Sequence, residues 1–248
     1  MRFSCHLQFF FLTLFFLSSV TKSCFVQSIG FKWEGQLDKN GMAQSLERSM
    51  LVGKQKVFDK DDFQSIEDEF VNYPNFLARR KVLLGLFTAK TNINNSNEET
   101  TTTVCDSLFG VNLLTFGQIK TSTFSRVVKS YKPEGDGDVE IRGVTARLPV
   151  VGGILSRHPK REASDNSNSL PVLGELVFEM KQTRPNLLHT KEGNLEMETQ
   201  VVDYMPALAG KPPIHFMRKA LYLNSQRYFH AYVMWRFHRH CYNEISQR

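Results

Sequence analysis

The sequence predicts an α+β protein in which an antiparallel sheet packs around one long C-terminal helix. Two short helices are expected after the first strand. Segments 174–183 and 194–204 alternate apolar and polar residues, as strands with one buried face do. Segment 59–72 spaces its apolar residues like an amphipathic helix. Segment 212–243 opens with two prolines and contains no later helix breaker, which predicts a helix of about 45 Å.

The N-terminal segment 1–23 is expected to be a cleaved signal peptide. Arg2 and His6 precede an apolar run from Leu7 to Val20, and small or polar residues follow, as in secretory signals. The run is shorter than the ~20 residues needed to span a bilayer. We therefore expect entry into the secretory pathway and a secreted or lumenal location.

A second destination is suggested by the segment SCFVQS around Phe25. It resembles the leaders that direct proteins to the plastid in algae with secondary plastids, where a phenylalanine follows the signal peptide. That resemblance implies a plastid as the alternative location.

The rest of the 248-residue chain is expected to form one domain at 50–245, preceded by an N-terminal extension at 24–49. This length can bury a sizeable core without added staples. Outside the signal segment the only cysteines are Cys24, Cys105 and Cys241, too few for a disulfide framework. Cys105 and Cys241 are expected either to form a single bridge or to remain buried thiols.

The first part of the domain is expected to contain a strand at 50–58 and two helices. Asp59 or Asp61 is expected to cap the first helix, at 59–72. The second helix is expected at 74–87, beginning with a proline, although its end is equally compatible with a buried strand. The apolar face of the first helix is formed by Phe63, Ile66 and Phe70.

Two polar, low-complexity segments, 90–103 and 163–169, predict flexible loops. Asn94 in the first segment begins an Asn-Asn-Ser sequence, an N-glycosylation acceptor. Segments 121–132 and 136–148 flank a turn rich in glycine and aspartate, which predicts a β-hairpin. The two alternating strands described first are expected to form another hairpin.

The C-terminal helix is predicted to have one broad apolar stripe, which includes Leu223, Met234 and Cys241. On a helical wheel the opposite side carries polar residues, among them Gln226 and His230. We therefore expect this helix to lie against the strands with its polar side outward.

Three polar residues, Asn224, Arg227 and His238, interrupt the apolar stripe beside Ala220 and Ala231. Burying such groups without partners costs several kcal/mol, about 2–7 for a neutral amide, so each is expected to meet one. One interpretation is a ligand cavity in which the alanines leave space. Its candidate lining residues are Asn224, Arg227, Tyr228, Ala231, Trp235 and His238.

The alternative interpretation is purely structural. In that case Arg227 pairs with a carboxylate such as Asp203, Asn224 caps a strand end and His238 meets water.

Metal and nucleic-acid sites are not expected. His238 and Cys241 could share a ligand sphere, but no second cluster completes a zinc site. The aromatic residues lie on the buried stripe and are not interleaved with the basic residues, as nucleic-acid binding would require. No metal, cofactor or nucleic-acid partner is therefore predicted.

The C-terminal segment 211–248 is strongly basic, with seven Lys or Arg residues and one acidic residue. Arg218, Lys219 and Arg236 are candidates for docking on an acidic protein or an anionic membrane surface. A solvated helix face is the other interpretation of the same charges.

The order of elements resembles the helix-grip fold of the START-like superfamily. There a curved antiparallel sheet wraps a long terminal helix and leaves an apolar cavity. The resemblance rests on element order and brings no site residues with it. It implies binding or carriage of a hydrophobic or amphipathic small molecule, such as a lipid, an isoprenoid or a pigment-like compound.

Two other functions stay open. A cavity enzyme could perform proton-transfer chemistry as a cyclase, isomerase or dehydratase. Its catalytic residues are unknown, the least implausible being His238, Arg227, Asp203 and Tyr228. The third possibility is an interaction protein that uses its basic surface.

Overall fold

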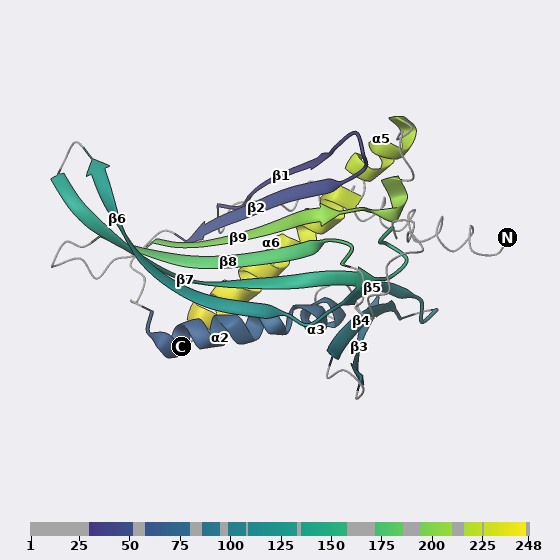
Figure 1. Ribbon diagram of the computed structural model, residues 1–248, viewed down its shortest axis with the longest axis horizontal. Coiled ribbons are helices and arrows are strands. Elements are labelled where there is room, and N and C mark those ends of the chain that lie inside the picture. Colours follow the sequence, from purple (N-terminus) through teal and green to yellow (C-terminus); the bar gives the residue numbers. More distant parts are fainter. Residues whose placement is uncertain are drawn as a thin grey trace, which may run out of the picture.

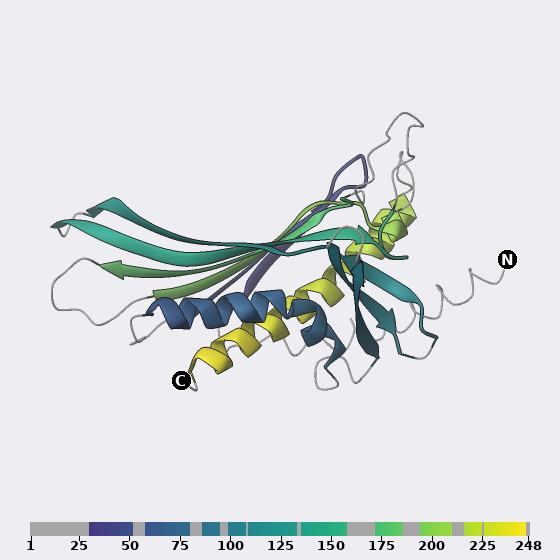
Figure 2. The ribbon, with the colours of Figure 1, turned by 60° about the horizontal axis from the view of Figure 1, so that its bottom comes forward.

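The structure is a curved, open antiparallel sheet whose concave face is covered by helices (Figures 1 and 2). The computed structural model describes residues 30–51, 58–79, 86–94, 99–107, 109–132, 135–157, 172–185, 194–209, 216–224 and 226–246. The strands are β1 (Lys32–Leu37), β2 (Ala43–Leu51), β3 (Phe87–Asn94), β4 (Glu99–Asp106), β5 (Asn112–Phe116), β6 (Lys120–Lys132), β7 (Gly135–Gly152), β8 (Glu175–Pro185) and β9 (Asn194–Tyr204). The helices are α2 (Lys60–Val71), α3 (Tyr73–Ala78), α5 (Phe216–Asn224) and α6 (Gln226–Ser246), with a short 3-10 turn, η1, at Ala207–Ala209. The predicted α+β class is confirmed.

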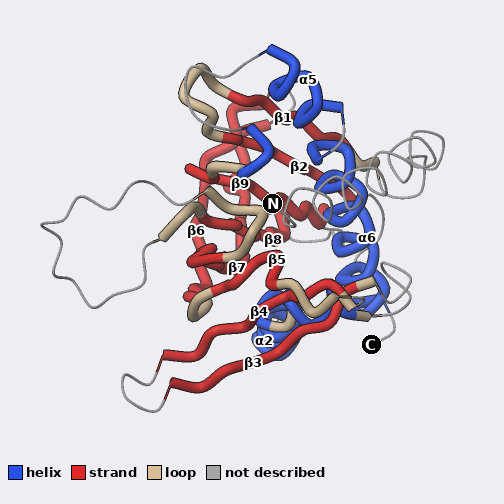
Figure 3. Tube along the Cα trace, turned by 90° about the vertical axis from the view of Figure 1, so that its right-hand side faces the viewer, coloured by secondary structure: helices blue, strands red, loops and turns tan. Residues whose placement is uncertain are grey.

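The sheet has nine strands in the order β1-β2-β9-β8-β7-β5-β4-β3, and β6 pairs with β7. Every strand pair among the described residues is antiparallel. The order places β2, early in the chain, beside β9, the last strand, with Leu51 opposite Leu195. Seen along the strands, α2 and α6 lie on the same side of the sheet (Figure 3).

The first two strands, β1 and β2, belong to the sheet, with β1 at its edge, whereas residues 24–49 were expected to form an extension before the domain. β1 and β2 form a hairpin, and β2 pairs with β9 over most of its length. Of the expected strand at 50–58, residues 50 and 51 form the end of β2. Residues 52–57 lie outside the described residues. Ser45, Glu47 and Ser49 occupy the inward-facing positions of β2, so β2 lacks the apolar alternation by which a strand is recognised.

Helix α2 begins as predicted, with Asp59 as its N-cap. The Asp59 carboxylate accepts hydrogen bonds from the backbone N–H groups of Asp61 (3.0 Å) and Asp62 (2.9 Å). The Asp62 side chain in turn accepts from the backbone of Asp59 at 3.0 Å, completing a capping box. The predicted apolar face, Phe63, Ile66 and Phe70, is buried.

The second short helix, α3, is shorter than the expected 74–87. It ends before Arg79, and Phe87 already begins β3. The suggestion that the end of this segment forms a strand is therefore correct for Phe87; residues 80–85 lie outside the described residues.

Within the segment expected to be a loop at 90–103, residues 90–94 and 99–103 instead belong to β3 and β4, which pair as antiparallel strands, and 95–98 lie outside the described residues. Threonine is β-branched and favours extended backbone, and this segment is rich in it. Thr91 and Thr102 face each other across the hairpin with their hydroxyl oxygens 3.4 Å apart. Asn94 is the last residue of β3. The expected loop at 163–169 and the expected signal peptide lie outside the described residues.

The later hairpins are confirmed. β6 pairs with β7, and β8 pairs with β9 in a register that puts Met180 opposite Met197. Leu176, Phe178 and Leu195 join these methionines in facing the core. The sheet is thus most apolar along β8 and the neighbouring part of β7.

Within the predicted helix at 212–243, all described residues are helical, in α5 and α6. Residues 212–215 and 225 lie outside the described residues. The Asn224 amide donates to the Ala220 carbonyl oxygen of its own helix at 2.7 Å. Helix α6 crosses the concave face of the sheet. None of the described helices is long and apolar enough to cross a membrane.

The main core lies where α2, α3 and α6 meet the sheet, and aromatic rings form its centre. Phe237 on α6 packs against Tyr73, Phe76 and Phe178 at ring-centroid distances of 4.9, 5.0 and 5.3 Å. Aromatic pairs at such spacing add stability beyond the apolar area they bury.

The two cysteines placed by the structure do not form the bridge that was one of the expectations. Cys105 and Cys241 are both buried free thiols.

Candidate functional site

A line of polar residues runs between β2 and α6, which we call the polar seam. It comprises Ser45, Glu47 and Ser49 on β2 and Gln226, Arg227, His230 and His238 on α6. Alternation along β2 directs its three residues to the concave face, where α6 lies. The two ends of the polar seam differ in how fully their polar atoms are paired.

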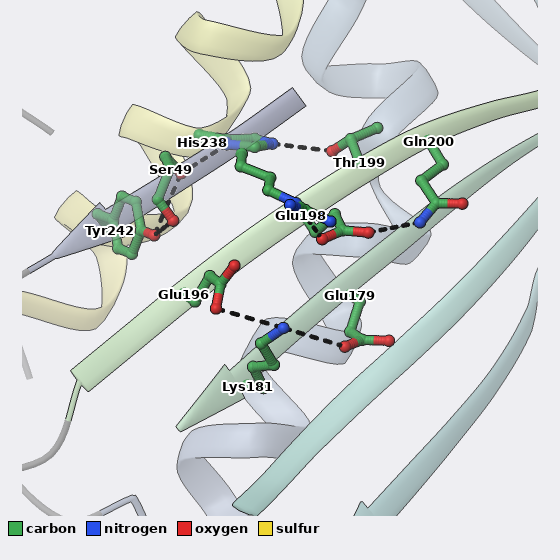
Figure 4. A network of polar contacts seen from close by, with 10 residues as sticks. Ser49, Glu179, Lys181, Glu196, Glu198, Thr199, Gln200, His238 and Tyr242 are labelled. Atoms are coloured by element: carbon green, nitrogen blue, oxygen red, sulfur yellow. Dashed lines mark hydrogen bonds and ion pairs between the residues drawn. The ribbon is translucent and has the colours of Figure 1, made fainter. Parts of the chain in front are cut away.

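The end at His238 is fully paired. The imidazole Nδ1 lies 2.6 Å from the Ser49 hydroxyl, and Nε2 lies 2.8 Å from the Thr199 hydroxyl (Figure 4). The Ser49 hydroxyl donates to the Tyr242 oxygen at 3.2 Å, and Tyr242 donates to the Ser49 carbonyl oxygen at 3.0 Å. Each imidazole nitrogen therefore has a hydroxyl partner, and because a hydroxyl can donate or accept, a neutral imidazole is satisfied in either tautomer.

His238 is completely buried. Burial and, to a smaller extent, electrostatic repulsion from the neighbouring His230 together lower the pKa of its imidazole to about 3. A neutral imidazole held at both nitrogens fixes α6 to β2 and β9. His238 is therefore a positioning residue of the fold, and it does not line the cavity described below.

The other end of the polar seam is incompletely paired. The Glu47 side chain is 1% exposed, and its Oε1 lies 3.3 Å from His230 Nε2. These two atoms do not form a hydrogen bond, and Glu47 Oε2 has no partner either. Three more buried atoms lack hydrogen-bond partners: Ser45 Oγ, Gln226 Oε1 and Arg227 Nε. Each such group costs about 1–3 kcal/mol while it remains unpaired.

Arg227 is nevertheless held in place. Its Nη1 donates to the Gly35 carbonyl oxygen at 2.9 Å, and its guanidinium carbon lies 4.9 Å from the centre of the Trp33 ring and 5.4 Å from that of Tyr228. Arg227 passes over Gly35 so closely that a Cβ at Gly35 would lie 2.8 Å from the Arg227 Cδ. The missing side chain of Gly35 thus makes room for the arginine.

A cavity of about 120 Å³, partly open to solvent, adjoins this unpaired end. Its wall is mainly apolar and comes from the sheet, from α3, α5 and α6, and from the segment that follows β7. The apolar and aromatic lining residues are Tyr73, Leu77, Phe87, Val104, Leu113, Leu114, Phe116, Val150, Leu155, Leu176, Val201, Tyr204, Tyr222, Phe229 and Val233. The polar lining residues are Ser45, Glu175, Gln226, Arg227 and His230.

Glu47 lies behind His230 and is not part of the lining. The cavity therefore has an apolar body and a polar end at the polar seam.

Of the predicted cavity residues, only Arg227 lines this cavity. Asn224 is exposed. Tyr228 packs edge-on against Trp33, and Ala231 is fully buried away from the cavity. Trp235 packs beside Tyr232. The structural alternative does not hold for Arg227 either, since Asp203 is exposed and Arg227 bonds to the backbone of β1.

Gln226 and His230 were predicted to lie on the outer side of the helix, but both line the cavity. More of the circumference of α6 is buried than a single apolar stripe would require, because the sheet, α2 and α3 all pack against this helix. Val233 and Phe237, on the same side as Gln226 and His230, are buried.

The predicted docking residues do not form one surface. Arg218 and Lys219 are exposed on α5. Arg236 is half-buried on α6.

No protein-family model matches the chain, and a search of curated proteins finds no relative. Among the residues that the structure describes, no three His, Cys, Asp or Glu side chains gather closely enough to hold a metal ion.

Proposed function

We propose that the protein binds and carries a hydrophobic or amphipathic small molecule in the cavity beneath α6. The observation that carries this proposal is the mainly apolar wall of the cavity, which has the polar residues Ser45, Gln226, Arg227 and His230 at one end. A ligand with one polar end would fill the apolar body and place that end beside these residues.

The architecture supports the same proposal. A curved antiparallel sheet around a long C-terminal helix is compatible with the helix-grip arrangement of START-like proteins. Membership of that superfamily is part of the proposal, as is the class of ligand that it implies.

The size of the cavity limits what it holds. A volume of about 120 Å³ is close to that of engineered apolar cavities of about 150 Å³, which accept one benzene ring. The part of a lipid, isoprenoid or pigment-like molecule enclosed here would be about one ring in size. A longer tail would leave through the open side.

The test is native mass spectrometry of residues 24–248 produced in a eukaryotic secretory host, with extraction of any bound molecule. We expect a discrete added mass that Arg227→Ala abolishes. Asn224→Ala is the matched control, because Asn224 is exposed and near in sequence. A ligand-free protein that also takes up nothing from a lipid extract would refute the proposal.

A second candidate is a cavity enzyme, favoured by the proximity of Glu47 and His230. A carboxylate beside an imidazole at the edge of a cavity is a common arrangement for proton transfer. The residues considered from sequence do not gather there: both nitrogens of His238 are hydrogen-bonded, and Asp203 is exposed.

Glu47→Gln separates this candidate from a carrier. A carrier would retain the same ligand mass at reduced occupancy. An enzyme would accumulate a molecule that differs from the one bound to the unmodified protein.

Docking on a membrane is a third candidate, and the exposed part of α5 favours it. Phe216 and Met217 are 74% and 62% exposed beside the exposed cations Arg218 and Lys219. Apolar side chains next to cations suit the interface of an anionic membrane. Tyr222 of the same helix lines the cavity, which would place ligand exchange near that surface.

Vesicle sedimentation tests this candidate. The protein should bind vesicles containing phosphatidylserine and not pure phosphatidylcholine, and Arg218→Glu with Lys219→Glu should abolish binding. Arg236→Glu is the control and should retain it. Equal binding to both vesicle types would exclude docking through charge.

A further inference from the structure

We propose that the part of the ligand enclosed in the cavity is a flat aromatic or conjugated ring, in preference to a saturated ring or an alkyl chain. This inference rests on the proposed carriage function and narrows its class of ligand. It follows from the side chains of the cavity wall, from the arrangement of their rings and from the size of the space.

Aromatic side chains make up a large part of the wall. Six of the fifteen apolar and aromatic lining residues carry a ring, and they come from the sheet and from three helices: Tyr73, Phe87, Phe116, Tyr204, Tyr222 and Phe229. The other nine are leucine or valine. Aliphatic side chains contribute through the apolar area that they bury, so they favour any apolar ligand of the same size to a similar extent. The preference for one kind of apolar group over another therefore depends on the aromatic residues.

Four of these rings are arranged in two edge-to-face pairs. Phe87 on β3 and Phe229 on α6 have ring centroids 6.3 Å apart and ring planes at 76°. Tyr73 on α3 and Phe116 on β5 have ring centroids 6.2 Å apart and ring planes at 78°. Because the two rings of each pair are nearly perpendicular, the pair offers both ring edges and ring faces. A third ring beside it can therefore make the edge-to-face or offset contact that aromatic rings prefer.

The tyrosines of the wall are neutral at physiological pH. Burial raises the pKa of the Tyr204 hydroxyl to about 12, and it raises the pKa values of Tyr73 and Tyr222 as well. The Tyr204 hydroxyl donates to the Leu155 carbonyl oxygen at 2.7 Å. The aromatic part of the wall thus carries no charge and suits an uncharged ring.

The size of the space favours a rigid group. A volume of about 120 Å³ is close to that of engineered cavities that accept one benzene ring. A flat ring has no rotatable bonds and loses no internal freedom when it enters, whereas an alkyl chain must give up rotamers in a space of this size. A saturated ring is also rigid, but it lacks the π-electrons on which edge-to-face contacts depend.

Three alcohols with the same number of carbon atoms test the inference: benzyl alcohol, cyclohexylmethanol and straight-chain heptanol. They carry the same hydroxyl group and differ only in the apolar part, which is an aromatic ring, a saturated ring or a chain. Titration calorimetry measures their affinities for the ligand-free protein, and amide NMR shifts show whether they enter the cavity. Each affinity is divided by the partition coefficient of that alcohol between octanol and water, which corrects for its hydrophobicity.

We expect the corrected affinity of benzyl alcohol to exceed those of the other two by about tenfold, as one or two aromatic contacts would give. In Phe229→Leu this advantage should shrink several-fold, while cyclohexylmethanol and heptanol keep their affinities. Phe109→Leu is the matched control, because Phe109 is 59% exposed and is not among the described lining residues; it should leave all three affinities unchanged. A melting curve shows whether each variant is folded, and Phe87→Leu, which removes the other ring of the pair, replaces Phe229→Leu if that variant is not.

The contrary outcomes are distinct. If cyclohexylmethanol or heptanol equals or exceeds benzyl alcohol in corrected affinity, the aromatic inference fails and the carriage proposal stands. If Phe229→Leu keeps the full preference, the aromatic pair does not create it and the inference fails as well. If none of the three alcohols binds, the inference fails, and the carriage proposal is then decided by whether the protein takes up a molecule from a lipid extract.

Discussion

The imidazole of His238 lies 2.6 Å from the hydroxyl of Ser49, although 189 positions separate them in the sequence. This contact joins the last helix to one of the first strands. Thr199 of β9 holds the other imidazole nitrogen, so one side chain connects three elements. Complete burial of the imidazole favours its neutral form, which is why its pKa is lowered.

Acid should destabilise the protein through His238. The folded pKa of about 3 lies below the ordinary value of 6.5, so between these values the unfolded chain binds a proton that the folded chain does not. The stability contributed by the neutral imidazole is complete above pH 6.5 and is lost as the pH falls toward 3. From pH 7 to pH 5 we expect a loss of about 2 kcal/mol in the free energy of unfolding.

Urea denaturation at both pH values measures this loss. Other histidines and carboxylates also titrate, so His238→Gln provides the comparison. The variant should show a weaker pH dependence than the unmodified protein. Identical slopes for the two proteins would contradict the prediction.

Gly35→Ala should weaken ligand binding without unfolding the sheet. The new methyl group would lie 2.8–2.9 Å from the Cδ and Cγ of Arg227, a flexible side chain that can move aside and would then leave its place over Trp33. Native mass spectrometry should show a several-fold lower ligand occupancy, while the melting temperature changes by only a few degrees.

Gly152→Ala is the matched substitution in β7. Its methyl group would meet Thr115 at ordinary contact distances of 3.5–3.6 Å. It should leave ligand occupancy unchanged. If both substitutions reduce occupancy equally, Gly35 has no special role.

Phe237→Ala should be among the most destabilising core substitutions. The side chain is fully buried and packs on four aromatic rings, those of Phe70, Tyr73, Phe76 and Phe178, so its removal leaves a cavity and should cost about 3–5 kcal/mol. Chemical denaturation measures this cost. Val172→Ala, at a position 58% exposed, should cost less than about 0.5 kcal/mol; a similar loss at both positions would argue against the aromatic cluster as the core.

Asp59→Ala should destabilise the protein by about 1 kcal/mol through loss of the α2 N-cap. The substitution leaves the backbone N–H groups of Asp61 and Asp62 without their acceptor. Asp59→Ser, which can still cap, should recover most of the loss in a thermal melt. If Asp59→Ser is as unstable as Asp59→Ala, the stabilisation comes from the charge of Asp59 and not from its hydrogen bonds.

The sequence was sufficient to predict the strands whose buried face is apolar. β8 alternates Leu176, Phe178 and Met180 with polar neighbours, and its pairing with β9 follows from the short connection. β2 was missed because its buried face carries Ser45, Glu47 and other small or polar residues. Without knowledge of the facing helix, such a segment is typical of an exposed strand or an extension.

The same physical reason limited prediction of the site. Arg227 was found because it interrupts an apolar stripe. Gln226 and His230 were missed because a polar residue facing an internal cavity looks, on a helical wheel, like one facing water. The pairing that distinguishes the two cases joins residues far apart in the chain, and local periodicity carries no trace of it.

The placement of β2 beside β9 and α6 has a consequence for how the chain acquires its structure. During synthesis the β1–β2 hairpin emerges first, and its partners are made only after most of the polypeptide. Until then Glu47 and Ser49 stay solvated, and the inner surface of the hairpin has nothing to pack on. Contacts that close such long loops slow folding, so we expect the final assembly to be a late, post-translational event in which both ends of the chain meet.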